Sequence, residues 1–531
     1  MALTERFAGF HLASTLALRA TTDPDRAFLI TRDRQCTYAE VDSRSEALAA
    51  SLSGLGVEPG DRVALILPSC PEFVVSLFAV AKLGGIVVPV NPRQPASEIQ
   101  HMLRHSEAVC AITVERAYGI DFLLLFEDLQ VRLPELQYLV TVGDEDLWYD
   151  DRVFQYADLL SAGAGRDYPA AAIEPTRDCF AILYTSGTTG KPKGVELSHR
   201  NLVSAAAGTA DAIGLHDGDR AVGVSALYHV FGLAPGLLST VLAGAALIVE
   251  DEPDAGATLD LVQRHRATVH YGVPTMFVAE LREQERAPRD LSSLRLAMPA
   301  GGPVSRDLVR EIRDQLCATV LVGYSLTETS STVCVTRPGD SPLLQEETVG
   351  RPLAGTQVRI LERDGQELPH RSVGEIALRG PGVMLGYHRQ PSETAAAFDP
   401  EGFLLTGDLG VVDEVGYVHL VGRRKEVIIR AGFSVYPREV EFRLEAHPAV
   451  REVAVVGIPD PLLGEASCAC IVPVEGAIVT SEEIRHWCRD VFAPPKVPDQ
   501  VRFFDAFPRT GTGKVRRIEL ARMCQAEGEP A

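Results

Sequence analysis

The sequence predicts an α/β fold: a large N-terminal region of parallel-rich sheets wrapped by helices, a small β-rich subdomain, and a C-terminal α+β unit. Three observations lead to this fold class. Short apolar runs alternate with helical periodicity from Thr37 to Val322, as expected for parallel sheets covered by helices. From Glu346 onward short strands and turns dominate, and from Val440 helices and strands alternate again. A chain of 531 residues has room for more than one such domain.

The individual elements follow from apolar spacing and from the residues that begin and end helices. We expect a helix with a threonine cap over residues 37–50 and a buried strand over residues 62–67, which Pro68 ends. A second helix should follow over residues 73–83, closed by Gly84, and a second strand over residues 86–90. The alternation continues through residues 101–103, 111–114, 201–213, 246–249, 259–265 and 319–322. In the C-terminal unit a helix should begin near Pro437, followed by elements over residues 453–458, 467–472, 481–491 and 501–504.

Composition and charge exclude several classes of protein. The net charge of −21 argues against nucleic acid or an anionic membrane as the main partner. No apolar run reaches the roughly 20 residues needed to span a bilayer. The N-terminus lacks the continuous apolar core of a signal peptide. We therefore expect a soluble, cytoplasmic enzyme.

The ten cysteines are scattered and include no CxxC pair. Cys468 and Cys470 are two apart in an apolar, strand-like run, so both should point to one face. For the cysteines we expect buried thiols in a reducing cytoplasm rather than a metal site or disulfides.

The stretch from Tyr184 to Val195 follows the apolar run 179–183 and contains three glycines, four serine or threonine hydroxyls and two lysines. Backbone amides, hydroxyls and ammonium groups at this density suit a polyphosphate. The spacing differs from the P-loop, and Pro192 disfavours a helix directly after Lys191, so the loop should stay extended. The residues expected to hold phosphate are Thr185, Ser186, Gly187, Thr188, Thr189, Gly190, Lys191 and Lys193.

Two further stretches carry groups suited to a nucleotide. After the apolar run that ends at Val322, Tyr324 could stack on adenine, Thr327 could bind the α-phosphate, and Glu328 could hold Mg²⁺ through hard oxygen. Asp408 follows another apolar run, and its carboxylate could accept both ribose hydroxyls.

Together these stretches resemble the adenylate-forming superfamily, which contains acyl-CoA synthetases, peptide-synthetase adenylation domains and luciferases. The stretch TSGTTGKPKG at residues 185–194 is similar to its phosphate loop, and residues 323–328 and 406–408 are similar to its aromatic-x-x-Thr-Glu and TGD motifs. Residues 508–515 resemble its closing PKTxSGK motif. The resemblance extends over nearly the whole chain.

The resemblance implies roles for residues that spacing alone would leave unassigned. The adenine-binding turn would contain Gly301, Gly302 and Pro303, and Arg423 would reach the ribose. Lys425 would be the hinge, Ala431, Gly432 and Phe433 would border the CoA tunnel, and Lys514 would be the catalytic lysine. The acyl pocket would be lined by Tyr228, His229, Val230, Phe231, Gly323 and Ser325, with His229 as its gate.

The resemblance also implies a domain division and a reaction. Residues 1–421 would form the AMP-binding domain and residues 422–531 a mobile lid. A carboxylic acid would react with ATP and Mg²⁺ to give an acyl-adenylate, and CoA would then displace AMP. The alternatives are a ligase that loads an acyl carrier protein, a non-catalytic nucleotide-binding homologue and a luciferase-like oxygenase. Because residues 226–233 contain no acid, an amino-acid substrate is disfavoured. The oligomeric state stays open.

Overall fold

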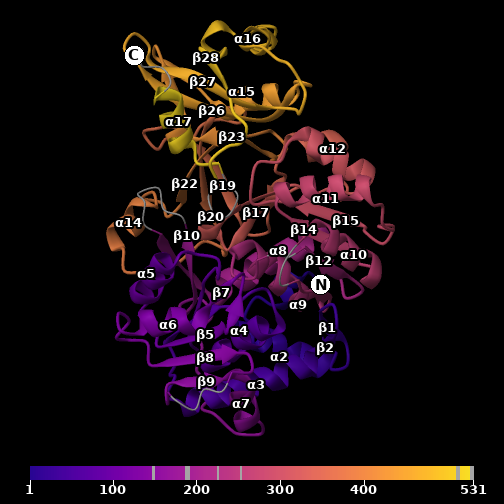
Figure 1. The fold of residues 1–531 in the computed structure, drawn as a ribbon, viewed down its shortest axis with the longest axis vertical. Helices are drawn as coiled ribbons and strands as arrows, with labels where there is room; N and C mark the ends of the chain where they lie inside the picture. The colour runs from indigo at the N-terminus through magenta and orange to yellow at the C-terminus, as the bar shows by residue number, and fades with distance from the viewer. Residues whose placement is uncertain (146–149, 186–191, 224–225, 251–253, 510–514, 527–531) are drawn as a thin grey trace.

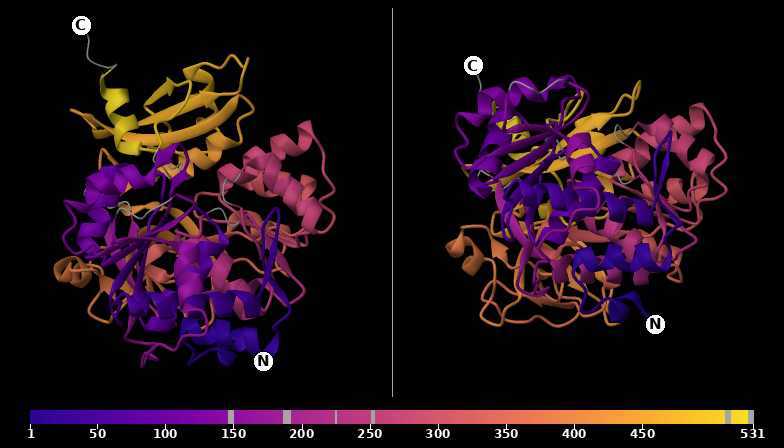
Figure 2. Two further views of the ribbon diagram at one scale, coloured as in Figure 1. Left: turned by 60° about the horizontal axis from the view of Figure 1, so that its bottom comes forward. Right: turned by 90° about the horizontal axis from the view of Figure 1, so that it is seen from below.

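The structure is a computed structural model that describes residues 1–145, 150–185, 192–223, 226–250, 254–509 and 515–526. Two large, mostly parallel sheets form the N-terminal region, and a smaller C-terminal unit packs on one end of it (Figure 1). Figure 2 shows the same arrangement from two further sides, with the C-terminal unit in yellow. No helix in the described part of the chain is long and apolar enough to cross a membrane.

The larger sheet has the strand order β21-β11-β10-β4-β3-β5-β8-β9. Its strands from β10 to β9 run parallel, whereas β11 and β21 add on antiparallel. The bounds are β3 Arg62–Ile66, β4 Ile86–Pro89, β5 Cys110–Val114, β8 Tyr138–Val142, β9 Val153–Gln155, β10 Cys179–Thr185, β11 Lys193–Ser198 and β21 Gly386–Tyr387.

The second sheet has the order β15-β14-β12-β13-β1-β2 and is parallel except for the edge pair β1 and β2. The bounds are β1 Ala27–Ile30, β2 Gln35–Thr37, β12 Arg220–Val222, β13 Ala246–Ile248, β14 Val269–Gly272 and β15 Leu296–Pro299. A two-stranded ribbon of β6 Arg116–Ala117 and β7 Ile120–Asp121 stands apart from both sheets.

Helices fill the space between the two sheets and cover their outer faces. In β3, Val63 and Leu65 face the core shared by both sheets, while Ala64 and Ile66 face an outer core with α5 and α6. This alternation, apolar on both faces, is what a strand buried between helix layers requires. The shared core contains α2 Leu12–Thr22, α3 Tyr38–Gly54, α4 Pro71–Leu83, α8 His199–Ile213, the π-helix η1 Gly232–Leu238 and α9 Ser239–Ala243.

The remaining helices of this region lie outside the sheets or in connections. Those on the second sheet's outer face are α10 Ala255–His265, α11 Pro274–Arg286 and α12 Arg306–Gln315. The others are α1 Leu3–Arg6, α5 Ala96–Ser106, α6 Phe122–Gln130, α7 Tyr156–Gly163, α13 Pro342–Glu347 and α14 Pro391–Ala396.

Two small antiparallel sheets follow and lead toward the C-terminal unit. The first, β16-β17-β18, is formed by Gly323–Leu326, Ser331–Val335 and Arg351–Pro352, with the 3-10 turn η2 Thr327–Thr329 between its first two strands. The second, β19-β20-β22-β23, is formed by Gln357–Leu361, Gly374–Arg379, Leu404–Val412 and Val418–Arg423.

The C-terminal unit is one sheet with a core on each face. Its strands are β24 Ile428–Arg430, β25 Phe433–Val435, β26 Val450–Asp460, β27 Gly464–Pro473 and β28 Gln500–Phe503. Its helices are α15 Pro437–Glu445, α16 Ser481–Arg489 and α17 Arg517–Ala526, with the 3-10 turns η3 Arg424–Glu426 and η4 Pro494–Lys496. On β27, Ala469 and Ile471 pack with α15 and α16, while Cys468 and Cys470 pack with α17.

The predicted fold class is confirmed. The threonine-capped helix is α3, where Thr37 and Glu40 form a reciprocal capping box, and Gly84 closes α4 at φ 69°. One element is wrong: residues 319–322 form no strand, and Val320 makes only a single parallel bridge to Ala297. The strand is residues 323–326 themselves, paired antiparallel with β17, because the apolar run before them is buried as core rather than extended into a ladder.

Candidate active site

The predicted phosphate loop joins two antiparallel strands. Thr185 at the end of β10 pairs with Lys193 at the start of β11. The predicted residues between them, Ser186, Gly187, Thr188, Thr189, Gly190 and Lys191, lie outside the described residues. After the loop the chain continues as strand β11, as the proline predicts, and Ser198 then caps α8 through a reciprocal capping box with Asn201.

The entry to this loop is anchored by hydrogen bonds to α5. The Tyr184 hydroxyl lies 2.8 Å from His105 Nδ1 and donates to the Met102 carbonyl at 3.2 Å. Burial raises the pKa of Tyr184, so the phenol stays protonated. These contacts fix the last residues of β10 relative to the helix beside them.

Three of the predicted nucleotide-binding residues meet in one chain of contacts. The Tyr324 hydroxyl donates to Asp408 Oδ2 at 2.7 Å, and Arg423 Nε lies 3.0 Å from Asp408 Oδ1. Asp408 is only 6% exposed, so its charge is balanced by these two partners rather than by water. Burial, reinforced by the Asp408 carboxylate, raises the pKa of Tyr324 far above its usual value, which keeps the phenol a donor.

Backbone pairing explains why these residues meet. Asp408 and Arg423 are direct partners across the antiparallel ladder of β22 and β23, so their side chains share one face. Gly407 adopts φ 70°, a left-handed conformation that favours glycine, and the ladder register shifts between Leu409 and Gly410.

Glu328 is held by a residue that the sequence did not single out. Glu328 Oε1 accepts a hydrogen bond from the Tyr387 hydroxyl at 3.0 Å, and the Glu328 carbonyl accepts from the Met384 amide at 2.9 Å. The Lys193 ammonium lies 4.6 Å from the centre of the Tyr387 ring. Tyr387 therefore joins the end of the phosphate loop to the predicted metal ligand. Thr327 stands next to Glu328, half-buried at the start of η2.

Tyr387 carries no sequence signal because its partners are distant in the chain. It lies on the short edge strand β21, opposite Val195 of β11. Burial, with the Glu328 carboxylate adding to the effect, raises the pKa of Tyr387, so this phenol also remains a donor.

The predicted adenine-binding turn lies beside β16. Gly301 follows β15 with φ 80°, and Gly302 and Pro303 continue the turn. A Cβ at Gly323 would come within 2.8 Å of Met298 Cε and 3.6 Å of Ala300 Cβ. The absence of a side chain at position 323 is therefore what lets β16 approach the end of β15.

The predicted acyl-pocket segment leads into the π-helix. Val230 and Phe231 are buried, Tyr228 is half-buried and His229 is exposed. A Cβ at Gly232 would lie 2.1 Å from the Ala226 carbonyl oxygen, so this position requires glycine. The ring of Phe231 packs edge-on against Tyr271 of β14, with centroids 6.1 Å apart.

Tyr271 links this segment to the predicted adenine-binding turn. It pairs with Met298 of β15, the residue that Gly323 approaches. Ser325 lies two residues further along β16, half-buried and opposite Thr332 of β17.

The predicted hinge and tunnel residues lie on the C-terminal side. Lys425 stands in η3, directly after β23, and desolvation by its surroundings, together with the charge of Arg423, lowers the pKa of its ammonium group. Ala431 and Gly432 have φ 48° and 84° in the turn between β24 and β25, and the Phe433 side chain is 59% exposed. The predicted catalytic Lys514 lies outside the described residues, in a segment flanked by a bridge between Arg509 and Val515.

Comparison with known proteins identifies the family. A sequence profile of the AMP-binding enzymes matches residues 16–388, and a profile of the AMP-binding enzyme C-terminal domain matches residues 439–514.

Relatives match nearly the full length of the chain. A Mycobacterium tuberculosis CoA ligase, named for a propanoyl group on a methyl-dioxo-octahydroindenyl ring system, is 36% identical and covers 94% of this chain and 96% of its own. A long-chain-fatty-acid–CoA ligase of Bacillus subtilis is 30% identical and covers 96% of this chain and 94% of its own.

Solved structures share the fold. An anthranilate CoA ligase in complex with anthranoyl-AMP has a TM-score of 0.88 at 27% identity, covering 99% of this chain and all of that one. The o-succinylbenzoate CoA synthetase of Bacillus subtilis in complex with ATP and magnesium ion has a TM-score of 0.80 at 29% identity, with coverages of 95% and 98%. The chain therefore belongs to the AMP-binding enzyme family, on its AMP-forming CoA ligase branch.

Proposed function

We propose that this ligase activates an apolar monocarboxylic acid with ATP and transfers the acyl group to CoA, using the residues gathered around Tyr324, Asp408 and Arg423. The observation that carries the proposal is the contact chain of these three side chains, in which Tyr324 and Asp408 are buried and Arg423 is exposed. An aromatic ring beside a carboxylate and a guanidinium suits a nucleoside: the ring of Tyr324 stacks on adenine, while Asp408 and Arg423 bind the ribose hydroxyls. Gly301, Gly302 and Pro303 form the other wall of the adenine site.

The phosphates would lie between the loop and η2. Lys193 and Thr185 flank the loop, and Thr327 supplies a hydroxyl to the α-phosphate. The oxygen of Glu328, oriented by Tyr387, fits Mg²⁺, which prefers hard oxygen ligands and neutralises phosphate charge when bound. In the described part of the chain, Tyr387 donates to Oε1 of Glu328, so Oε2 is the oxygen that would take this role.

Charge explains the first half-reaction. A carboxylate oxygen of the acid forms a bond to the α-phosphorus, the bond from that phosphorus to the bridging oxygen breaks, and pyrophosphate takes the electron pair. Cationic and hydrogen-bonding groups fixed around the shifting charge are the largest catalytic contribution available. We assign Lys514, Thr327 and the phosphate loop to this role.

The second half-reaction needs a different lid position. The CoA thiolate attacks the acyl carbonyl carbon, and the bond to AMP breaks. Lys425 would be the pivot for the lid, residues 422–531, and the turn of Ala431, Gly432 and Phe433 would border the path of the thiol. The glycine in this turn lets the backbone approach a thioester closely.

The substrate class follows from the pocket segment. Tyr228, Val230 and Phe231 present aromatic and aliphatic surface, and His229 is the basic residue of the stretch. A charged tail would lose its hydration there without gaining a partner, so amino acids and dicarboxylates are disfavoured. Ser325 adds bulk beside Tyr324, which favours short-to-medium or compact ring acids. Family membership does not fix chain length, because the relatives include both ring-acid and long-chain ligases.

The test is a panel of carboxylic acids scored by pyrophosphate release, with and without CoA. We expect release with apolar monocarboxylic acids and thioester formation when CoA is present. Release without any thioester on free CoA, but with loading of an acyl carrier protein, would favour the carrier-protein alternative. Release with none of the acids would favour a non-catalytic homologue. A cytoplasmic location stays a prediction of the sequence.

A further inference from the structure

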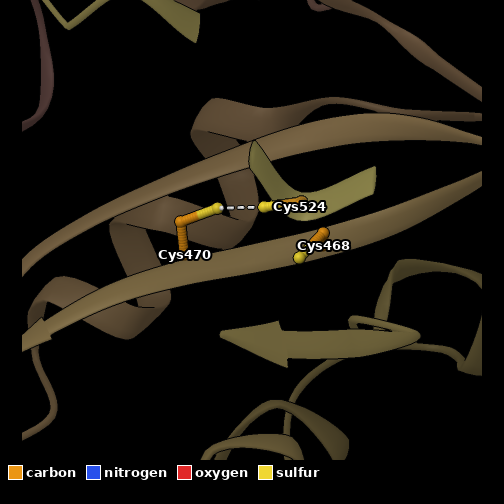
Figure 3. A group of neighbouring side chains, drawn as sticks. All are labelled: Cys468, Cys470 and Cys524. Atoms are coloured by element: carbon orange, nitrogen blue, oxygen red, sulfur yellow. Dashed lines mark hydrogen bonds between the residues drawn. The ribbon is translucent and has the colours of Figure 1, made fainter. Parts of the chain in front are cut away.

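Three cysteines of the C-terminal unit converge on one point. Cys468 and Cys470 lie two apart on β27 and face α17, which brings Cys524 to them from 54 residues further along the chain. The three sulfur atoms lie within 4.8 Å of one another, and the Cys470 and Cys524 sulfurs are 3.3 Å apart. Figure 3 shows Cys470 and Cys524 pointing toward each other, with Cys468 beside them on the strand.

The sequence alone favours buried thiols over a metal site, but this convergence changes the interpretation: we propose that Cys468, Cys470 and Cys524 form a binding site for a divalent thiophilic cation of the Zn²⁺ class. A tetrahedral ion with metal–sulfur bonds of about 2.3 Å holds its thiolates about 3.8 Å apart. The observed separations, from 3.3 Å to at most 4.8 Å, bracket this spacing. Small side-chain rotations would therefore complete the geometry without moving the backbone.

The surroundings of the three sulfurs favour a soft ion. All three side chains are buried, with exposures of 0 to 1%, and the walls are aliphatic and aromatic, including Val456, Leu520 and Phe507. Thiolates are the ligands that select soft cations in such a site. Among the described residues no fourth histidine, cysteine or carboxylate joins the group, so the remaining coordination position is left to a small ligand such as water.

Charge balance favours a divalent ion over a monovalent one. Three thiolates with one divalent cation leave a net charge of −1, and Arg502 can offset it. Arg502 lies on β28 as the direct partner of Cys470, so its positive charge stands on the strand next to the three cysteines.

A disulfide accounts for the cluster less well. It would join two sulfurs at about 2.05 Å and leave the third without a role. Cys468 and Cys470 cannot pair with each other, because residues two apart on a strand are too widely spaced for a disulfide. A metal site, unlike a disulfide, gives a role to all three sulfurs.

The site would stabilise the lid where the catalytic segment ends. α17 begins at Arg517, soon after the segment that carries Lys514, and Arg517 pairs with Glu441 and Glu426. A metal ion shared by β27 and α17 would fix this helix on the sheet. The site is separate from the nucleotide-binding residues, so it stands independently of the proposed function.

The experiment is a titration of the reduced, metal-free full chain with Cd²⁺ alone, followed by ultraviolet thiolate-to-cadmium charge-transfer absorption. We expect one equivalent to bind, Zn²⁺ to compete for the same site, and the unfolding temperature of the loaded protein to rise. Cys468→Ser, Cys470→Ser and Cys524→Ser should each weaken binding at least tenfold. Cys488→Ser is the matched control, because Cys488 is equally buried but packs on the opposite face of the sheet; it should leave binding unchanged.

A measurement on the unaltered protein guards against variants that fail to fold. X-ray absorption of the Cd²⁺-loaded wild-type chain should give three sulfur ligands. A count below three, full binding by Cys524→Ser, or no bound Cd²⁺ would each overturn the site. A Cys470–Cys524 disulfide mapped by mass spectrometry in the freshly purified protein would overturn it as well, since the cluster would then be a redox pair.

Discussion

At the scale of single residues, the structure adds Tyr387 to the predicted site, and its hydroxyl is the group to test. Tyr387→Phe removes the hydrogen bond to Glu328 and leaves the ring under Lys193. A hydrogen bond to a charged group contributes about 1.5–3 kcal/mol, so the Mg²⁺ concentration for half-maximal adenylation should rise roughly tenfold or more. Tyr156→Phe removes a buried hydroxyl far from Glu328 and is the control. An unchanged Mg²⁺ requirement in Tyr387→Phe would show that the tyrosine does not position Glu328.

Lys514 should serve only one half-reaction. Lys514→Ala is expected to reduce acyl-adenylate formation by roughly 10²–10³, the usual effect of removing one group that stabilises transition-state charge. Conversion of supplied acyl-adenylate to thioester should survive, because no charge develops on pyrophosphate in that step. Lys496→Ala, which removes a lysine paired with Glu439 elsewhere on the lid, is the matched control. Single-turnover measurements of both steps would refute the assignment if the two losses were equal.

Ser325 should limit the length of the acyl group. Ser325→Gly removes the side chain beside Tyr324, so the ratio of kcat/KM for a longer acid to that for a shorter one should increase. One methylene in an apolar pocket changes the discrimination between two substrates by about 1–3 kcal/mol. This value is the upper range for the expected change in the ratio of kcat/KM. The measurement is kcat/KM over a series of straight-chain acids. If the wild-type enzyme preferred long-chain fatty acids, amino acids or dicarboxylates, the predicted substrate class of this pocket would be wrong.

At the scale of elements, the short turn η3 between β23 and β24 is the predicted pivot. Lys425→Pro fixes φ at the centre of this turn. Adenylation should persist, because a lid fixed in one position can still serve that step. Thioester formation should be lost, because it needs a different lid position. Lys425→Ala leaves φ free to change. Comparison with it separates the effect of the proline ring from the loss of the lysine side chain. A larger loss in the adenylation step than in the thioester step, measured separately, would exclude Lys425 as the pivot.

Elements with strong local signals were predictable from the sequence, and contacts between distant segments were not. The capping box of α3 and the glycine that ends α4 could be predicted because the residues that form them lie within a few positions of the helix ends. Residues 319–322 were predicted as a strand because they are apolar, but burial without a neighbouring ladder satisfies the same pattern. Motif residues such as Tyr324 and Asp408 could be named from the sequence, yet their mutual contact across 84 positions came only from the fold. Tyr387 and Cys524 had no local pattern at all, since each acquires its partners through sheet and helix packing.

At the scale of the whole molecule, the C-terminal unit and the large region are in contact through half-buried side chains, among them the Arg306 guanidinium, which lies 4.6 Å from the ring centre of Phe442. Contacts of this kind are weak and reversible, which is what the proposed movement of the lid would require. Both parts of the molecule also contribute to one long-range electrostatic field. The net charge of −21 opposes the approach of ATP and CoA, whereas in the proposed site Lys193 would attract phosphate and Arg423 would bind ribose at short range.

The last prediction concerns this long-range repulsion. Raising the ionic strength from about 0.01 M to about 0.15 M shortens the screening length from about 30 Å to about 8 Å, which hides distant charges but leaves close contacts largely intact. The kcat/KM for CoA and for ATP should therefore increase severalfold over this range, whereas kcat/KM for the singly charged acid should change much less. The series is measured with two different salts at constant free Mg²⁺, so that an effect of one particular ion can be recognised. A decrease in kcat/KM for both phosphate-bearing substrates would mean that the local cationic groups, rather than the net charge, control their approach.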